Sequence, residues 1–453
     1  MAPSTPSERA ERLADRTAML RLAWPALCEN LLSTLVQFVD TAMVGALGAA
    51  ATAAVGVNAS PMWLMNGLVS AIGVGGTALV ARQTGAGDHE GAEATCRQVF
   101  QGILVLSALI CAAAMVLAQW LPAWMQADPS LHADATAYLR IVAAAFVPHF
   151  TGMALGAVMR GAGNTRTPMQ VAAGANLLNV VGNFLLIFPT RTLTVFGVSF
   201  PMWGAGLGVR GAAISTAVST ALAGLVMVYM ICRPLRLDMP ILRRILNVGF
   251  PAALERLTLN VGQIFFVGLV SSLGTAQLAA HHLSLNVESL SYMPGFAFGV
   301  AATTLIGQSL GAQDPQRAMA RGALCIRAGV VVMSGIGVLL FAFAPWLIAM
   351  LSPDEEVRAI GTVLIRICAF EQPFMAMSMI GAGALRGAGD TRVPFYVSLA
   401  GMWGVRLILA WLLAIRFGLG VNGAWYAMVT DLCVRGVLMY VRFARGKWKT
   451  ASV

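Results

Sequence analysis

Residues 160–166 have the sequence RGAGNTR, and residues 386–392 have the sequence RGAGDTR, so one seven-residue motif occurs twice, 226 residues apart. The same offset aligns WPALCE at 24–29 with FPAALE at 250–255. The alignment runs without a gap from Pro25 to Pro168 of the first copy. Self-similarity over this length indicates an internal duplication, and the chain is expected to consist of two homologous halves.

The alignment changes after the motif, because GLGV at 206–209 matches GLGV at 418–421 with an offset of 212 instead of 226. The first half therefore carries fourteen additional residues, which we place around 191–203.

Composition indicates that lipid surrounds most of the chain. Hydrophobic residues make up 58% and charged residues 11% of the 453 residues, against roughly 45–50% and about 25% in soluble domains. Apolar stretches of about twenty residues, which suffice to cross a bilayer as helices, recur along the chain. Alternating strands of the barrel type are not expected. Twelve spans are predicted, at 18–44, 50–81, 94–119, 134–159, 167–189, 207–231, 247–271, 276–308, 321–350, 356–384, 393–415 and 421–443.

The sequence therefore predicts an all-α polytopic membrane protein with two six-helix bundles. Because six spans are an even number, both halves enter from the same side and are related by a pseudo-two-fold axis along the membrane normal. A cavity between the halves is the natural place for a substrate, although a duplicated membrane chain need not transport anything. The expected divisions are a cytoplasmic tail (1–17), the first bundle (18–232), a cytoplasmic linker (233–246), the second bundle (247–443) and a cytoplasmic tail (444–453).

The formal net charge of +10 is explained by topology. Arginines and lysines gather before the first span and in the loops on that same side, whereas the alternate loops are uncharged or acidic. The asymmetry predicts an inner-membrane protein with both termini in the cytoplasm. It also argues against nucleic acid as a partner. The polar N-terminus lacks the apolar core of a cleavable signal peptide.

Other functional classes find no support in the motifs. The seven cysteines are scattered without metal-ligand spacing, so no metal site is expected. No nucleophile–histidine–acid arrangement indicates an enzyme, and neither a cofactor nor an obligate protein partner is implied. The glycine-rich motifs lack the Gly-Lys-Ser/Thr of a phosphate-binding loop.

Three segments together resemble the multidrug and toxic compound extrusion (MATE) family, particularly its NorM-like branch, over nearly the whole chain. They are VDTAMVG at 39–45, GQSLGA at 307–312 and the paired RGAG motifs. The resemblance implies two bundles around a central cleft that opens alternately to either side. It also implies export of bulky, often cationic, organic compounds, driven by inward flow of protons or sodium ions.

Asp40 is the first candidate for cation coupling. A carboxylate inside a membrane span is costly and is by default a functional candidate. Glu29, Ser33, Gln37 and Asp40 lie at i, i+4, i+8 and i+11, on one helical face that should line an internal cavity. The resemblance implies that Asp40 is the coupling residue of the first half. A purely structural polar contact is the alternative.

Two asparagines of the fifth span, Asn179 and Asn183, are expected to join Asp40. They match an Asn-x-x-x-Asp pair that surrounds the cation in some family members, but Asn183 is an amide here and brings no charge. Asparagines that only hold neighbouring helices together are an equally good interpretation.

The second half supplies Glu255 and Glu371 as further candidates for cation coupling, because the NorM-like branch uses acidic residues of the seventh and tenth spans. Glu255 is followed by Arg256, so a structural ion pair is an alternative interpretation. A further set of polar residues is expected to line the substrate cleft: Glu29, Gln37, Gln263, Asn286, Glu288 and Tyr292.

Two other functions remain open. A flippase for lipid-linked glycans or an organic-acid exporter would show clustered arginines inside the membrane, and no cluster is expected among Arg140, Arg256, Arg366, Arg406 and Arg435. A passive channel would need no buried carboxylate such as Asp40. The sequence identifies neither the coupling ion nor the substrate.

Overall fold

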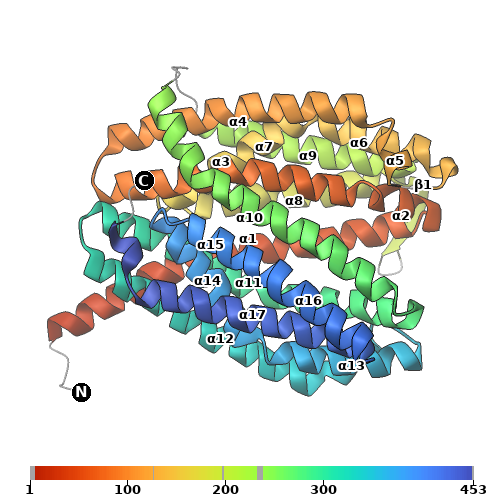
Figure 1. Cartoon of the computed structure of the whole chain (residues 1–453). Helices are drawn as coiled ribbons and strands as arrows, with labels where there is room; N and C mark the ends of the chain where they lie inside the picture. Colours follow the sequence, from red (N-terminus) through yellow and green to blue (C-terminus); the bar gives the residue numbers. More distant parts are fainter. Residues whose placement is uncertain (1–5, 126, 196–197, 232–237, 451–453) are drawn as a thin grey trace.

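The computed structural model describes residues 6–125, 127–195, 198–231 and 238–450, and it is almost entirely helical (Figure 1). The first half contains α1 (Pro6–Gly45), α2 (Ala49–Gly56), α3 (Ala59–Gly85), α4 (His89–Leu117), α5 (Leu121–Trp124), η1 (Pro129–Leu131), α6 (His132–Ala144), α7 (Phe146–Gly161), α8 (Arg166–Leu186), β1 (Pro189–Val195), β2 (Val198–Ala205) and α9 (Gly208–Ile231). The second half contains α10 (Met239–Ser271), α11 (Thr275–Gly311), α12 (Pro315–Ala349), α13 (Glu355–Ala369), α14 (Gln372–Gly387), α15 (Arg392–Leu399), η2 (Ala400–Arg406), α16 (Leu407–Ala410), η3 (Trp411–Arg416), α17 (Gly420–Ala444) and η4 (Lys447–Thr450). We call these halves the N-lobe and the C-lobe.

The predicted fold class is confirmed. Within the described residues, nine helices are long and apolar enough to cross a membrane. The number of candidate spans rises to eleven if each of two bent helix pairs counts as one span. The helix α17 has 25 residues and completes the twelve predicted spans, although it carries Asp431, Arg435 and Arg442. Each bent pair, α6 with α7 and α13 with α14, turns by 54° at its break.

Several helices begin earlier than predicted, and the difference is largest for α1 and α10. The helix α1 begins at Pro6, within the expected tail, and α10 begins at Met239, within the expected linker. The side chain of Asp238 explains the second start, because it accepts a hydrogen bond from the backbone N–H of Ile241, 3.2 Å away, and caps the helix.

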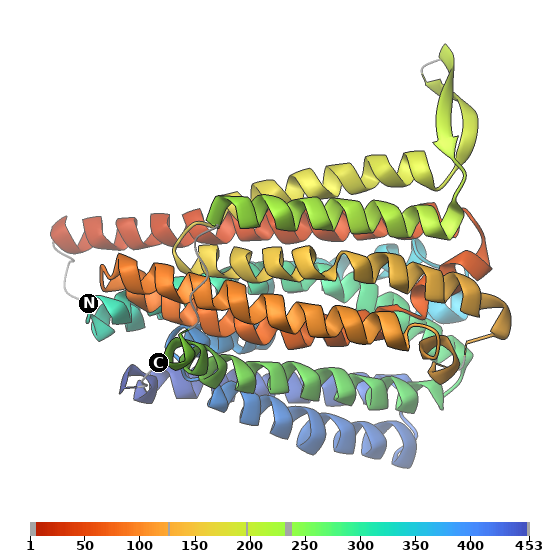
Figure 2. The same ribbon diagram turned by 90° about the horizontal axis from the view of Figure 1, so that it is seen from above.

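The additional residues of the first half form a β-hairpin that the sequence analysis did not predict. Strands β1 and β2 pair antiparallel, with Leu193 opposite Phe200. The hairpin protrudes at the end of the molecule opposite the two chain termini (Figure 2). Its sequence alternates threonine with other residues from Thr190 to Thr194, a composition that suits strands.

Each lobe extends its first helix against the other lobe. The helix α1 packs on α8 of its own lobe and on α11 of the C-lobe, and α10 packs correspondingly on α15 and on α3. The helices α3 and α11 also pack directly on one another. The duplication seen in the sequence is thus repeated in the packing.

The lobes meet closely at the end of the molecule that holds both termini, which we call the terminal side. Gly85 at the end of α3 and Gly311 at the end of α11 are repeat equivalents. A Cβ on Gly85 would lie 1.9 Å from the carbonyl oxygen of Gln308, and one on Gly311 would lie 1.9 Å from that of Arg82. Thr304 also donates a hydrogen bond of 2.9 Å to the carbonyl oxygen of Arg160. Only glycine allows this approach, and it closes the lobes against each other on the terminal side.

We expect Gly85→Leu and Gly311→Leu to shift the protein away from this closed arrangement. The clashing atoms belong to the backbone and cannot rotate away, so the cost should be about 1–3 kcal/mol, or roughly 5- to 150-fold in the ratio of closed to open states. Distances between spin labels on the terminal ends of the two lobes measure the shift. Gly174→Leu is the matched control, because nothing lies within 4 Å of a Cβ there. Unchanged distances in both test variants would show that these glycines do not hold the lobes closed.

Candidate functional site

Asp40 and Asn183 come together in the N-lobe. The amide of Asn183 on α8 donates a hydrogen bond of 2.5 Å to the carboxylate of Asp40 on α1. The same amide lies 3.4 Å from the oxygen of Asn179, whose own amide donates to the hydroxyl of Thr216 on α9 at 3.3 Å. Within the described part of the chain, the side-chain oxygen of Asn183 has no hydrogen-bond partner, and the residue is 1% exposed. A buried acceptor of this kind is suited to a water molecule or a cation.

The predicted polar face of α1 continues from Asp40 toward the terminal side. Asn176 of α8 donates to the hydroxyl of Ser33 at 3.4 Å, and Arg160 at the end of α7 donates to Glu29 at 3.1 and 3.3 Å. Gln37 is exposed. A pocket of about 220 Å³, which we call the N-lobe pocket, lies between α1, α7, α8 and α9 and is lined by Glu29, Ser33, Asn176 and Arg160 among others.

Glu255 does not lie in a free cation site. Arg386 donates to its two carboxylate oxygens at 3.1 and 3.0 Å, and Ser398 donates at 3.1 Å. The pair repeats Glu29 with Arg160, 226 residues earlier, so each lobe joins its first helix to its fourth span by the same ion pair. Because Arg386 balances the charge of Glu255, the structure favours the structural alternative, an ion pair with another helix.

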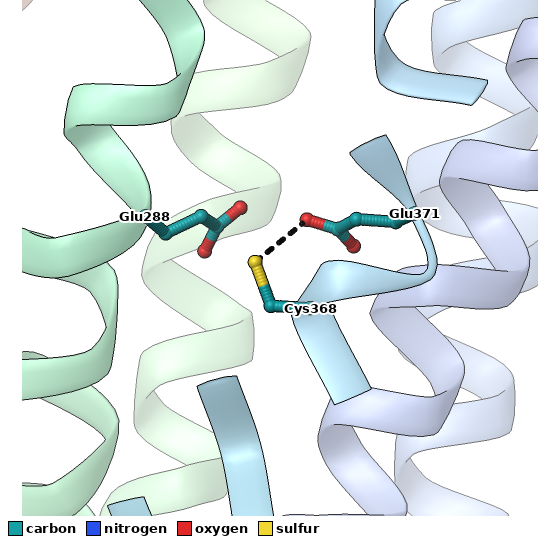
Figure 3. Close-up of side chains that lie close together, drawn as sticks. All are labelled: Glu288, Cys368 and Glu371. Carbon is teal, nitrogen blue, oxygen red and sulfur yellow. Dashed lines mark hydrogen bonds between the residues drawn. The ribbon is translucent and has the colours of Figure 1, made fainter. Parts of the chain in front are cut away.

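A buried acidic group lies in the C-lobe (Figure 3). Ligand atoms of Glu288 on α11 and of Cys368 and Glu371 at the junction of α13 and α14 lie within 4.8 Å of one another. Both glutamates are fully buried. Tyr292 donates a hydrogen bond of 2.6 Å to Glu288, as its position four residues along the helix predicts, and the thiol of Cys368 lies 3.6 Å from Glu371. Glu288 is thus inaccessible to a substrate in this conformation, whereas Asn286 is exposed.

The bend of the tenth span positions this group. It places Cys368 in the last turn of α13 and Glu371 at the residue before α14. The N-terminus of α14 carries partial positive charge, which favours a carboxylate there. Two buried carboxylates at this separation cannot both stay ionised without compensation, so the pair is suited to hold a shared proton or a small cation. Among the described residues, this is the one group of His, Cys, Asp or Glu side chains arranged to ligate an ion.

A second charged network lies nearby and corrects the expectation that the membrane arginines are not clustered. Arg406 and Arg435 both donate to Asp431, at 2.8 and 2.7 Å. Arg406 also donates to the half-buried Gln263 at 3.5 Å, which connects this predicted cleft residue to the network. The expectation failed because Arg406 lies on the π-helix η2 and Arg435 on α17, which become neighbours only in the fold.

Taken together, the C-lobe interior carries one uncompensated negative charge if all its groups are ionised. The buried acids are Glu255, Glu288, Glu371 and Asp431; Arg386 balances Glu255, and Arg406 and Arg435 are the remaining bases. Arg406 acts electrostatically on both glutamates. One proton or one monovalent cation on the glutamate pair therefore makes the interior neutral.

Comparison with known proteins identifies the family of the chain. Residues 25–185 and 251–412 match the model of the MatE family, one segment in each lobe. The chain belongs to the MATE family. Members of this family are transporters and not enzymes. The match confirms the resemblance and the prediction that the protein is not an enzyme.

Relatives of this MATE protein match it over nearly its full length. The probable multidrug resistance protein NorM of Thermotoga maritima is 30% identical and covers 97% of this chain and 94% of its own. The multidrug resistance protein PmpM of Pseudomonas aeruginosa is 29% identical over 98% and 94%.

Solved structures share the fold. A crystal structure of MATE in complex with MaD3S has a TM-score of 0.87 at 20% identity and covers 96% of this chain and 97% of that one. A structure of the outward-facing conformation of a multidrug resistance MATE family transporter also has a TM-score of 0.87 at 20% identity, with coverage of 97% of each chain.

Proposed function

We propose that this MATE protein is a secondary antiporter that exports organic, often cationic, compounds in exchange for protons or sodium ions. The observation that carries the exchange is the buried pair Glu288 and Glu371. A fully buried pair of acids, in a network with one excess negative charge, needs a cation in one state of the cycle and can release it in another. The names of the relatives, which are multidrug resistance proteins, support the substrate class.

Asp40 with Asn183 is the proposed coupling site of the N-lobe. A cation there would have the carboxylate of Asp40 and the unpartnered oxygen of Asn183 as ligands, with Asn179 supporting Asn183. The acidic residues proposed for coupling thus lie on different spans in the two lobes. The acid of the N-lobe lies on the first span, and the acids of the C-lobe lie on the eighth and tenth spans. The exposed Gln37 and Asn286 remain the proposed cleft residues.

We propose further that the terminal side faces the cytoplasm of an inner-membrane protein. The functional lobes are then residues 18–232 and 247–443, joined through 233–246, with cytoplasmic tails at 1–17 and 444–453. In this orientation the close contact at Gly85 and Gly311 shuts the cytoplasmic side, and the structure represents an outward-facing state. Alternating access requires that this contact opens when the substrate enters.

Purified protein in liposomes tests the function. A fluorescent organic cation is loaded, and its export is followed under an imposed proton gradient and, separately, a sodium gradient. Export that follows one gradient supports antiport and names the ion. No gradient-dependent export of several such dyes would contradict the proposal and favour an anionic or lipid substrate, and equal flux without any gradient would favour a channel. The arginine cluster does not itself favour an anionic substrate, because Asp431 already occupies it.

We expect Glu371→Gln and Glu288→Gln each to lower gradient-driven export by about tenfold or more. Glutamine keeps the size of the side chain but removes the acid that takes up the cation, and it relieves the repulsion, so the fold should persist. Initial rates in the liposome assay measure the loss. Glu356→Gln, at an exposed position of α13, is the control and should export like the wild type. Wild-type rates in both pair variants would exclude the C-lobe pair from coupling.

A further inference from the structure

The N-lobe pocket has a counterpart in the C-lobe that larger side chains fill. The ion pair of Glu29 with Arg160 returns as Glu255 with Arg386, but the residues around it differ. At the offset of 226, Ser33 corresponds to Leu259, His149 to Met375, Gly156 to Ala382, Ala172 to Ser398 and Asn176 to Met402. Met375 and Met402 are 3% and 2% exposed, and Ser398 contacts Glu255 directly. The N-lobe is therefore hollow here, with a few polar side chains among small and apolar residues, where the C-lobe carries larger side chains.

The pocket continues the polar groups of the Asp40 site toward the terminal side. Asn176 lies on α8 one turn before Asn179, and Thr220 lines the pocket on α9 one turn after Thr216. Thr216 accepts a hydrogen bond from Asn179, which in turn contacts Asn183 and thereby Asp40. The other end of the pocket is the partly exposed pair of Glu29 and Arg160. Polar side chains thus connect Asp40 to the terminal side.

The volume of the pocket indicates what it can hold. Pockets for drug-sized ligands measure about 300–1,000 Å³, and this one measures about 220 Å³. The space is sufficient for several water molecules. A small cation that moves through the membrane interior needs water and polar side chains along its way, since its transfer into an apolar medium is prohibitive. Ser33, Asn176 and Thr220 are such side chains in the pocket.

We propose that the N-lobe pocket is a second cation site, where the hydrated coupling ion or proton passes between Asp40 and the terminal side. The inference rests on the proposed antiport. The polar side chains of Ser33, Asn176 and Thr220 line this site. Glu29 lies at its terminal end, where Arg160 balances its charge as Arg386 balances that of Glu255. The C-lobe lacks the equivalent passage because Leu259, Met375 and Met402 occupy its space.

The test fills the pocket with the side chains that the C-lobe carries. Ser33→Leu and Asn176→Met, singly and together, should lower gradient-driven net export about tenfold or more, whereas exchange of labelled for unlabelled substrate without a gradient should stay within about twofold. Net export needs the cation to leave toward the terminal side, but exchange cycles only substrate-loaded protein. Glu29→Gln adds no bulk but leaves the guanidinium of Arg160 without its counter-charge beside the pocket. The positive charge should repel the cation, so net export should fall while exchange stays unchanged. Leu177→Met, at an exposed neighbouring position of α8, is the control.

Three results would contradict the second cation site or the antiport proposal on which it rests. Loss of both net export and exchange would overturn the inference, because the pocket would then serve substrate movement or the fold. Unchanged net export in the filled variants would overturn it as well and leave antiport intact. A wild type without gradient-driven export would overturn the antiport proposal itself, and the second cation site with it.

Discussion

We expect Asp40→Asn to lose roughly 100-fold in gradient-driven export, at the upper end of typical coupling free energies. Asparagine keeps the oxygen that accepts from Asn183, so the contact between α1 and α8 should persist. The variant removes only the charge, and a neutral side chain can neither take up a proton nor attract sodium. Substrate binding to the purified variant, followed by fluorescence, should stay close to that of the wild type.

The control for this prediction is Asp128→Asn. Asp128 lies in an exposed turn and caps η1, and hydrogen bonds from the hydroxyl and the backbone N–H of Ser130 hold its pKa below the usual value. It is therefore ionised throughout the pH range of a transport assay, so its replacement removes a carboxylate charge outside the membrane helices. Export should be unchanged. If Asp40→Asn exports normally while Glu371→Gln does not, coupling belongs to the C-lobe alone.

Most of the fold was predictable because the bilayer restricts it. Every span needs about twenty apolar residues in a closed hydrogen-bonded helix, and the duplication fixes how the halves correspond. The alternating threonines are a local signal for the strands β1 and β2, whereas the repeat alignment indicates only an insertion at this place. The early start of α10 likewise had a local signal, the capping Asp238 followed by Pro240.

The candidate site was predictable where it depends on one helix. The shared face of Glu29, Ser33, Gln37 and Asp40 follows from helical periodicity, and so does the contact of Glu288 with Tyr292. Partners on distant helices were not predictable. The approach of Glu371 to Glu288 depends on a 54° bend between α13 and α14. Pro373 at the start of α14 indicates a break in the helix, but it does not indicate that the break faces Glu288 on α11.

Asp431 shows what sequence reasoning overlooked. It lies four residues before Arg435 on α17, a spacing that favours an ion pair on one helix. The third member, Arg406, comes from a π-helical segment, where the usual helical spacing does not apply.

We expect Asp431→Asn to destabilise the protein by about 3–5 kcal/mol, the typical cost of removing one partner from a buried ion pair. Asp431 is fully buried, and the side chains of Arg406 and Arg435 are 8% exposed. Without the carboxylate, two guanidinium groups lie close together with no counter-charge between them. Chemical unfolding in mixed micelles, followed by tryptophan fluorescence, measures the loss.

Two further variants test whether the loss of stability in Asp431→Asn comes from unpaired buried charge. Asp431→Asn combined with Arg435→Met removes one acid and one base, restores the charge balance and should recover at least half of the lost stability. Asp390→Asn removes the partner of Arg442 in a more exposed pair and should cost about 1 kcal/mol or less. The N-lobe carries asparagine, Asn164, at the equivalent position of its own turn, so the backbone tolerates the change. If Asp431→Asn costs no more than Asp390→Asn, other groups compensate Arg406 and Arg435, and Asp431 is not the residue that holds these buried arginines stably in the fold.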